Sequence, residues 1–297
     1  MKNITILLGL LLVVTSCVEP DNTINDVLDN YTNGAVIRTI TSSGEYNFYA
    51  PTKSIFTATI EEHDTEGGDL MQNIEIYVSL NTGAESLFQT IQPGEFTTGP
   101  TGLPRTDISV SLDQAMTSLG LSSSQYTGGD AVNIRLKLNL TDGRSFSSEN
   151  ATGSMTGSYF KSPYKYAKII KCIPFSAVPG IYTFNLADSY GDGWQGGRVK
   201  VSVDGIPTYH GIPSAYDAIG AGQNVGLEPY TGNDSSGKTT LTIPAGASTV
   251  VVEWIADSYN SECSFTVGYT NLSGGNAQTA LIESVVTVGV KVLSICE

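Results

Sequence analysis

Apolar and polar residues alternate with a period of two along most of this chain, as expected for strands with one buried face. No segment sustains a long helical period, and the sequence therefore predicts an all-β protein. One short helix is expected at 112–119, where Ser111 and Gln114 fit a capping box and Gly120 fits a helix stop. The strands are expected at 34–41, 45–50, 54–61, 72–80, 106–111, 131–140 and 144–149, then at 181–187, 198–203, 238–243, 249–255, 263–269 and twice between 281 and 295.

The spacing of these strands favours two β-sandwich domains, with a single β-barrel as the alternative. We expect an immunoglobulin-like sandwich over 34–160 and a jelly-roll-like sandwich over 178–297. The segment 161–177 holds four lysines and two prolines and is interpreted as a linker. Ahead of these domains we expect a signal peptide at 1–16 and a flexible, lipid-anchored acidic tether at 17–33.

The N-terminus has the order of a secretory signal: a lysine, an apolar run over 4–14, small residues and then Cys17. The apolar run is too short to span a bilayer. Val14-Thr15-Ser16-Cys17 resembles the bacterial lipobox, and the resemblance implies that Cys17 is lipidated and anchors the mature chain. The acidic residues Glu19 and Asp21 also resemble the surface-export signal of Bacteroidota lipoproteins, which implies an outer-membrane protein facing the cell exterior.

Two of the later cysteines frame the second domain. Cys172 precedes its first strand and Cys296 follows its last, so a Cys172–Cys296 disulfide is expected in an oxidising compartment. Cys263 alternates in phase with Phe265 and Val267 and is expected to be a buried thiol. Pairing of Cys263 with one of the other two remains the competing arrangement.

Acidic side chains outnumber basic ones 29 to 15, giving a formal charge of −14. Such a balance repels phosphates, so nucleic acid is excluded as an expected partner. The acidic segment E-E-H-D-T-E-G-G-D at 61–69 is interpreted as a solvated loop between strands.

The motif A-D-S-Y occurs twice, at 187–190 and at 256–259, each time directly after a strand. Calcium takes six to eight oxygen ligands, and both loops are rich in carboxylates, amides and carbonyls. The loops do not match an EF-hand, because Tyr190 and Val199 stand where two ligands belong. An ordinary turn closed by Asp188 is the alternative to a metal site. The expected calcium ligands are Asp188, Asp192, the Trp194 carbonyl, Asp257 and Glu262. Glu262 is expected to join the site if the strands that end at residues 187 and 255 lie side by side.

Two resemblances bear on function. The C-terminal part of the chain contains D-S-Y-G-D-G-W-Q-G at 188–196, Trp254, Tyr259, Ser261, Glu262, Ser264 and Phe265. Through these residues it resembles secreted β-sandwich modules of the D-S-x-G-D-G-W type, and the resemblance implies adhesion or binding. The N-terminal part of the chain contains N-G-A-V at 33–36, T-T-G-P at 97–100 and L-N-L-T-D-G-R at 138–144. Through these segments it resembles Bacteroidota lipoproteins that accompany a TonB-dependent importer and its SusD-like partner. That resemblance implies an accessory protein of a nutrient-uptake complex, which captures a glycan or other polymer.

The sequence predicts a binding protein rather than an enzyme. It holds two histidines, His63 and His210, and no nucleophile elbow or metalloprotease motif. The long segment 206–237 is the expected binding loop. A hydrolase with an acid pair and a structural or adhesive surface protein remain the alternatives. The aromatic side chains expected to contact a ligand are Trp194, Tyr209, Tyr216, Tyr230 and Tyr259.

Overall fold

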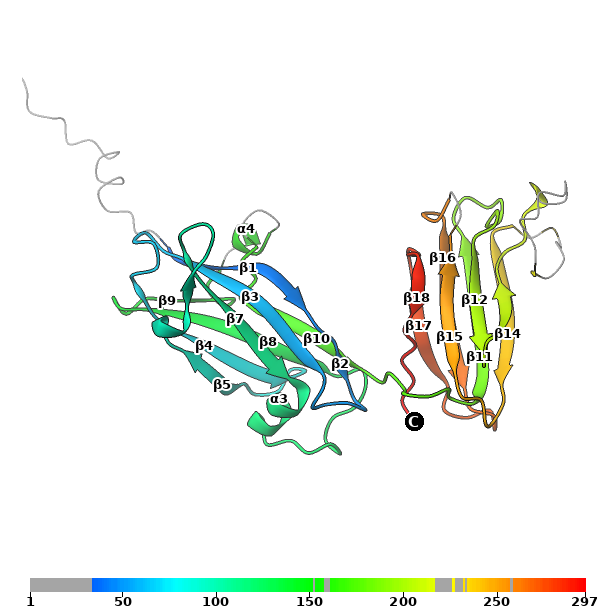
Figure 1. Cartoon of the computed structure of the whole chain (residues 1–297), viewed down its shortest axis with the longest axis horizontal. Coiled ribbons are helices and arrows are strands. Elements are labelled where there is room, and N and C mark those ends of the chain that lie inside the picture. Colours follow the sequence, from blue (N-terminus) through cyan, green and yellow to red (C-terminus); the bar gives the residue numbers. More distant parts are fainter. Residues whose placement is uncertain are drawn as a thin grey trace, which may run out of the picture.

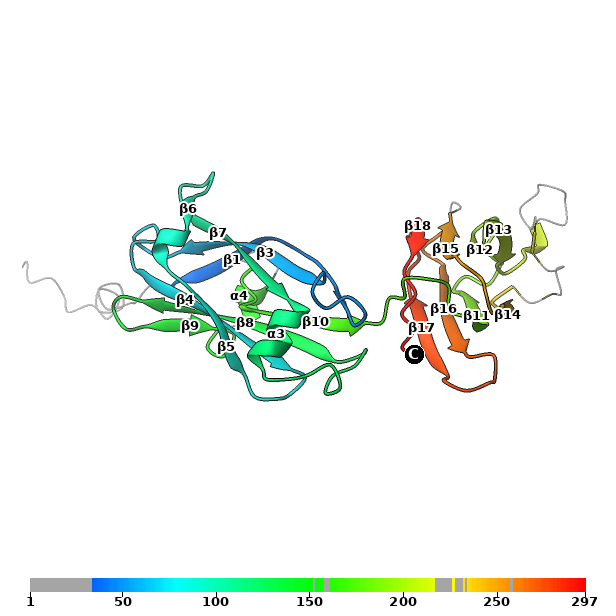
Figure 2. The ribbon, with the colours of Figure 1, turned by 60° about the horizontal axis from the view of Figure 1, so that its bottom comes forward.

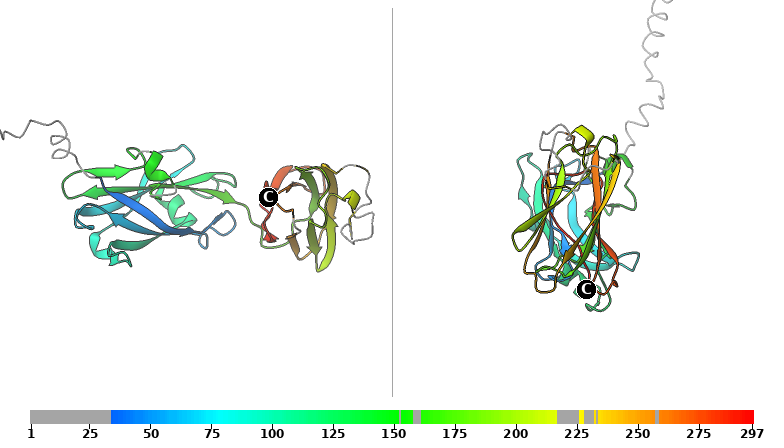
Figure 3. Two further views of the ribbon diagram at one scale, coloured as in Figure 1. Left: turned by 90° about the horizontal axis from the view of Figure 1, so that it is seen from above. Right: turned by 90° about the vertical axis from the view of Figure 1, so that its right-hand side faces the viewer.

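The computed structural model describes residues 34–151, 153–157, 161–216, 226–227, 232, 234–256 and 259–297. These residues form four sheets that pack as two β-sandwiches, arranged one after the other along the molecule (Figure 1). The left view of Figure 3 shows that a single segment joins them. The expected signal peptide, Cys17 and the tether lie outside the described residues. Within the described part of the chain, no helix has the length and apolar character needed to cross a membrane.

The N-terminal sandwich has the strand order expected of an immunoglobulin-like fold. One sheet runs β1-β3-β7-β6, which is the A-B-E-D order, and the other runs β2-β10-β8-β4-β5, with β9 also pairing β8. Figure 2 shows these sheets as two layers. The strands are β1 (Val36–Ser43), β2 (Tyr46–Asn47), β3 (Ile55–His63), β4 (Met71–Leu80), β5 (Ser86–Ile91), β6 (Thr97–Thr98), β7 (Pro104–Ser111), β8 (Ala131–Leu140), β9 (Ser145–Ser147) and β10 (Lys165–Lys171).

The helical elements of this sandwich are short. The predicted helix is confirmed as α3 (Leu112–Ser118), whose first turn is closed by reciprocal hydrogen bonds between Ser111 and Gln114. The other two are η1 (Pro93–Glu95) and α4 (Gly153–Thr156).

The predicted linker over 161–177 is wrong for its central part. Residues Lys165–Lys171 form β10, which pairs antiparallel with β8 in the N-terminal sheet. The lysines of β10 lie on its exposed or half-exposed positions, whereas Ile170 is buried in the core. The first sandwich therefore extends to residue 171, and the connection to the second is correspondingly short.

The C-terminal sandwich packs two four-stranded antiparallel sheets, in the orders β14-β11-β16-β17 and β13-β12-β15-β18. All the strands expected here are present, and β13 adds one within the segment 206–237 that had been assigned to a loop. The strands are β11 (Gly180–Asp188), β12 (Arg198–Val203), β13 (Ile206–His210), β14 (Ser236–Ile243), β15 (Val250–Ile255), β16 (Cys263–Thr270), β17 (Gln278–Glu283) and β18 (Gly289–Lys291).

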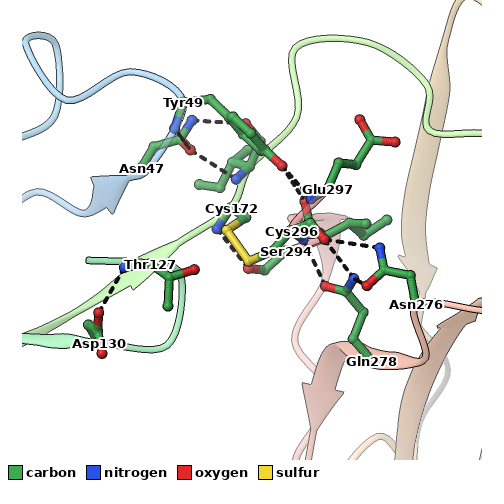
Figure 4. Close-up of a disulfide and its surroundings, with 12 residues drawn as sticks. Asn47, Tyr49, Thr127, Asp130, Cys172, Asn276, Gln278, Ser294, Cys296 and Glu297 are labelled. Carbon is green, nitrogen blue, oxygen red and sulfur yellow. Dashed lines mark hydrogen bonds between the residues drawn. A yellow bond between two sulfur atoms is a disulfide. The ribbon is translucent and has the colours of Figure 1, made fainter. Parts of the chain in front are cut away.

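The predicted disulfide between Cys172 and Cys296 is present at the junction of the two sandwiches (Figure 4). It joins the linker to the C-terminal end of the chain, where the Ile295 amide also donates to the Cys172 carbonyl at 2.7 Å. A Cβ on Gly128 would lie 2.2 and 2.3 Å from the two sulfur atoms, so the first sandwich packs its backbone against the bridge. Cys263 is a buried free thiol, as expected.

Tyr49 ties the first sandwich to the C-terminal end of the second (Figure 4). Its hydroxyl donates to the Ile295 carbonyl at 3.1 Å and accepts from the Glu297 amide at 2.8 Å. Two residues earlier, at the end of β2, the Asn47 side chain donates to the Ile173 carbonyl at 2.9 Å and accepts from the Ile173 amide at 2.9 Å. The junction is therefore held by hydrogen bonds as well as by the disulfide.

The acidic segment 61–69 is less solvated than expected, because Glu61 and Glu62 belong to β3 and are fully buried. Burial would raise the pKa of Glu61, but hydrogen bonds from Thr101 and Arg105 and the charges of Arg38 and Arg105 hold it below its usual value. Both Glu62 carboxyl oxygens are buried without a hydrogen-bond partner. Burial, reinforced by the charge of Asp64, raises the pKa of Glu62 to about 8.

Replacing both Cys172 and Cys296 by serine should destabilise the C-terminal sandwich. The bridge joins residues 124 positions apart, and its removal frees the unfolded chain to explore more conformations. The expected loss is about 2–5 kcal/mol in the free energy of unfolding, measured by urea denaturation. Reduction of the wild-type protein should give the same loss, and an unchanged midpoint for the serine variant would contradict this prediction.

Replacing Glu62 by glutamine should flatten the pH dependence of stability of the N-terminal sandwich. Because the folded pKa is raised, the folded state keeps a proton that the unfolded chain releases above about pH 4.5. The stability that Glu62 contributes is therefore greatest below that pH and is lost as the pH rises through about 8. The loss amounts to at most about 1.4 kcal/mol per pH unit. Urea denaturation at pH 5, 6.5 and 8 measures this slope. The exposed Glu66→Gln is the matched control and should keep the wild-type slope.

Candidate functional site

The pairing of β11 with β16 brings the two candidate loops together. Asp188 is the last residue of β11 and lies opposite Cys263, the first residue of β16. Beyond this pair the chains remain in contact, since the Ser189 amide donates to the Glu262 carbonyl at 3.0 Å. The loop that follows Asp188 and the loop that ends at Glu262 therefore lie side by side at one end of the sandwich.

This arrangement corrects the geometric reason for expecting Glu262 near Asp188. The sequence interpretation required the strands that end at residues 187 and 255 to be neighbours, but β11 and β15 belong to opposite sheets. Glu262 reaches the site because it immediately precedes β16, the hydrogen-bonded neighbour of β11.

Strand alternation places Asp188 inside the protein. Along β11, Tyr182, Phe184 and Leu186 point into the core, and Asp188 continues the same face with 6% of its surface exposed. Its Oδ1 accepts hydrogen bonds from the Tyr190 amide at 2.8 Å and the Gly191 amide at 3.0 Å. Its Oδ2 is buried with no hydrogen-bond partner.

Asp188, Asp192 and Glu262 form one carboxylate cluster, in which one oxygen from each lies within 4.8 Å of the others. Asp192 Oδ1 is also buried without a hydrogen-bond partner. Three carboxylates this close repel one another, and a buried oxygen without a donor is costly. A shared cation relieves both, and an all-oxygen ligand set suits a hard cation such as calcium.

Glycine at position 193 is required by the turn that carries Asp192 into the cluster. Its φ is +84°, and a Cβ would lie 2.7 Å from the Ser214 Cα and 2.9 Å from the Pro213 carbonyl oxygen. The Gly193 amide donates to the Asp234 carbonyl at 3.1 Å, so the turn is fixed against the chain just before β14.

Trp194 is a core residue, which corrects its expected role as a ligand platform. Its side chain is 1% exposed and packs edge-on against Trp254 at 5.1 Å. Its indole nitrogen donates to the Ala187 carbonyl at 3.1 Å, which attaches the loop to β11. The Trp194 carbonyl, expected as a calcium ligand, accepts the Gly197 amide at 2.7 Å.

The tyrosines that the sequence predicted to contact a ligand differ in exposure. Tyr216 and Tyr259 are 60% and 53% exposed. Tyr209 is half-buried, because Arg198 lies over its ring at 5.1 Å and the Gly226 backbone also packs against the ring. Asp257 and Tyr230 lie outside the described residues.

Two residues near the cluster were missed by sequence reasoning. Tyr190, the tyrosine of the first A-D-S-Y, is 75% exposed and directly follows the Asp188 turn. Asp234 supplies the carbonyl that holds Gly193 and has a buried carboxylate oxygen. The motif A-D-S-Y ends in a tyrosine in both of its copies, and this repetition could have pointed to Tyr190. The sequence around Asp234 holds no comparable pattern.

His210 lies apart from the carboxylate cluster, beside a cleft of about 810 Å³ between β13 and β14. Its ring stacks on Phe184 with centroids 4.1 Å apart, and Nδ1 lies 2.8 Å from the Thr239 hydroxyl. Burial lowers its pKa to about 4. His210 is therefore neutral near pH 7 and links the two sheets.

No protein-family model matches this chain, and no curated protein matches it significantly.

Proposed function

We propose that this chain is a non-enzymatic lipoprotein of the outer-membrane surface, whose C-terminal sandwich binds calcium and holds an extracellular glycan or other polymer. In this proposal the protein acts beside an importer and its SusD-like partner in nutrient uptake. The observation that carries the proposal is a pair of buried oxygens, Asp188 Oδ2 and Asp192 Oδ1, for which the described residues supply no hydrogen-bond partner. Both residues belong to the cluster with Glu262.

Calcium fits this donor set better than the transition metals do. The cluster offers carboxylate oxygens alone, whereas zinc and copper sites in proteins use imidazole or thiolate ligands. The nearby thiol of Cys263 donates to the Tyr259 carbonyl at 3.6 Å and is not part of the cluster. Asp188, Asp192 and Glu262 would supply the side-chain ligands, and the cation would balance their charge.

The grouping of three carboxylates supports a binding site over a hydrolytic one. Glycoside hydrolysis uses two carboxyl groups, one as an acid and the other as nucleophile or base. Here a third carboxylate shares the same space, with all three oxygens within 4.8 Å. Cation binding accounts for this grouping without requiring a proton on any of the three.

The membrane anchor in this proposal is Cys17. The charged, apolar and small residues before it have the order of a lipoprotein signal. One lipidated cysteine followed by an acidic tether would leave both sandwiches outside the bilayer.

Calorimetric titration of the full chain in detergent with CaCl₂ tests the cation site. We expect saturable binding and a raised melting temperature of the C-terminal sandwich, because a ligand that binds only the folded state stabilises it. Asp188→Asn and Glu262→Gln should each weaken binding by about tenfold or more, since each removes a charged ligand. The exposed Asp69→Asn, in the first sandwich, is the matched control. Absence of calcium binding, or hydrolysis of a polysaccharide lost in Glu262→Gln, would contradict the proposal.

Replacing Cys17 by alanine tests the anchor. The wild-type chain should sediment with the outer membrane and incorporate labelled palmitate, because the lipid is its expected attachment. The variant should incorporate no label and leave the outer-membrane fraction. An unlabelled wild-type chain would contradict the lipoprotein assignment.

A further inference from the structure

Three exposed tyrosines surround the carboxylate cluster. Tyr190, Tyr216 and Tyr259 are 75%, 60% and 53% exposed, although aromatic side chains are usually buried. Among the described residues of the linker and second sandwich, the other strongly exposed aromatic ring is Phe175, which lies in the linker at the opposite end of β11. Exposure of aromatic rings is therefore concentrated at the end of the sandwich that holds the cluster.

Each of these tyrosines is attached by hydrogen bonds to a different carboxylate residue. The Tyr190 amide donates to Asp188 Oδ1 at 2.8 Å, and the Glu262 amide donates to the Tyr259 carbonyl at 3.0 Å.

Tyr216 is attached through Ser214. The Tyr216 amide donates to the Ser214 hydroxyl at 3.2 Å, and that hydroxyl donates to the Asp192 carbonyl at 2.7 Å. The Tyr190 link uses the Asp188 carboxylate, whereas the other two links reach the backbone of Glu262 and Asp192. Each residue of the cluster is thus joined to one tyrosine by one or two hydrogen bonds.

Resting on the cation site proposed above, we propose that Tyr190, Tyr216 and Tyr259 form a calcium-dependent binding surface for neutral glycans. A cation shared by the three carboxylates fixes the backbone that carries each ring, so the spacing of the rings depends on it. Preorganising a surface in this way lowers the ordering cost of binding.

The chemistry of this surface favours an uncharged ligand with hydroxyl groups. A tyrosine ring has a flat apolar face and a polar rim, and a sugar ring likewise has a face of C–H groups and a rim of hydroxyls. The carboxylates of the cluster repel acidic polymers and anionic lipid surfaces. Calcium would neutralise most of their charge, which lessens the attraction for a basic peptide.

Affinity electrophoresis of the full chain through gels containing β-glucan, xyloglucan or galactomannan tests this surface. In calcium, at least one of these neutral polysaccharides should retard the wild-type chain, and a chelator should abolish the retardation. Alanine at Tyr190, Tyr216 or Tyr259 should weaken retardation by roughly tenfold, whereas phenylalanine, which keeps the ring, should retain most of it. Phe175→Ala is the matched control and should behave as wild type.

Calcium titration of the same tyrosine variants separates the two proposals. The alanine variants should bind calcium as the wild type does, because their side chains are not ligands. Calcium binding without retardation by any of the three polysaccharides would overturn the glycan surface and leave the cation site standing. Retardation that persists in chelator, or binding instead to polyarginine or to anionic phosphatidylglycerol vesicles, would also overturn it. Absence of calcium binding by the wild-type chain would overturn both the cation site and the glycan surface.

Discussion

The antiparallel register between β11 and β16 is the constraint on which the candidate site depends. These are the two central strands of one sheet, and their pairing sets Asp188 opposite Cys263. A shift of one residue would turn Asp188 to the other face of the sheet and expose Phe184 and Leu186 to solvent. The same alternation that buries the aromatic core therefore also buries the carboxylate, so core packing determines where the cluster forms.

The two sandwiches each bury an acidic side chain, and they differ in how its charge is balanced. Glu62 has no donor and no cation near its oxygens, and its raised pKa indicates that it is accommodated as the neutral acid. Asp188 shares its surroundings with two more carboxylates at the end of a strand, and both of these are half-buried. The charge at Glu62 is thus balanced by a proton, whereas the proposed function assigns a metal ion to the cluster around Asp188.

Most of the fold could be predicted from alternation, because each half-buried strand repeats its pattern locally. The helix at 112–119 followed from its local capping residues, and the Cys172–Cys296 bridge followed from the places of these cysteines at the two ends of the second domain. The strand β10 was missed because its lysines have the composition of a linker while their exposed positions are compatible with a strand. Trp194 was misassigned because a turn sequence does not reveal that its indole folds back onto Ala187. The meeting of Asp188 with Glu262 was expected from the repeated motif, but the pairing partner that causes it could be known only from the sheet order.

The disulfide at the junction also determines how the molecule would carry a mechanical load. From Cys172 the chain reaches Asp188 directly along β11. A second covalent route crosses the bridge to Cys296 and runs back along β18, β17 and β16 to Glu262. A pull applied at the cluster end would therefore reach the junction by two covalent routes while the bridge is intact. In the proposed function, these two routes would connect a lipid anchor at one end of the molecule to a bound polymer at the other.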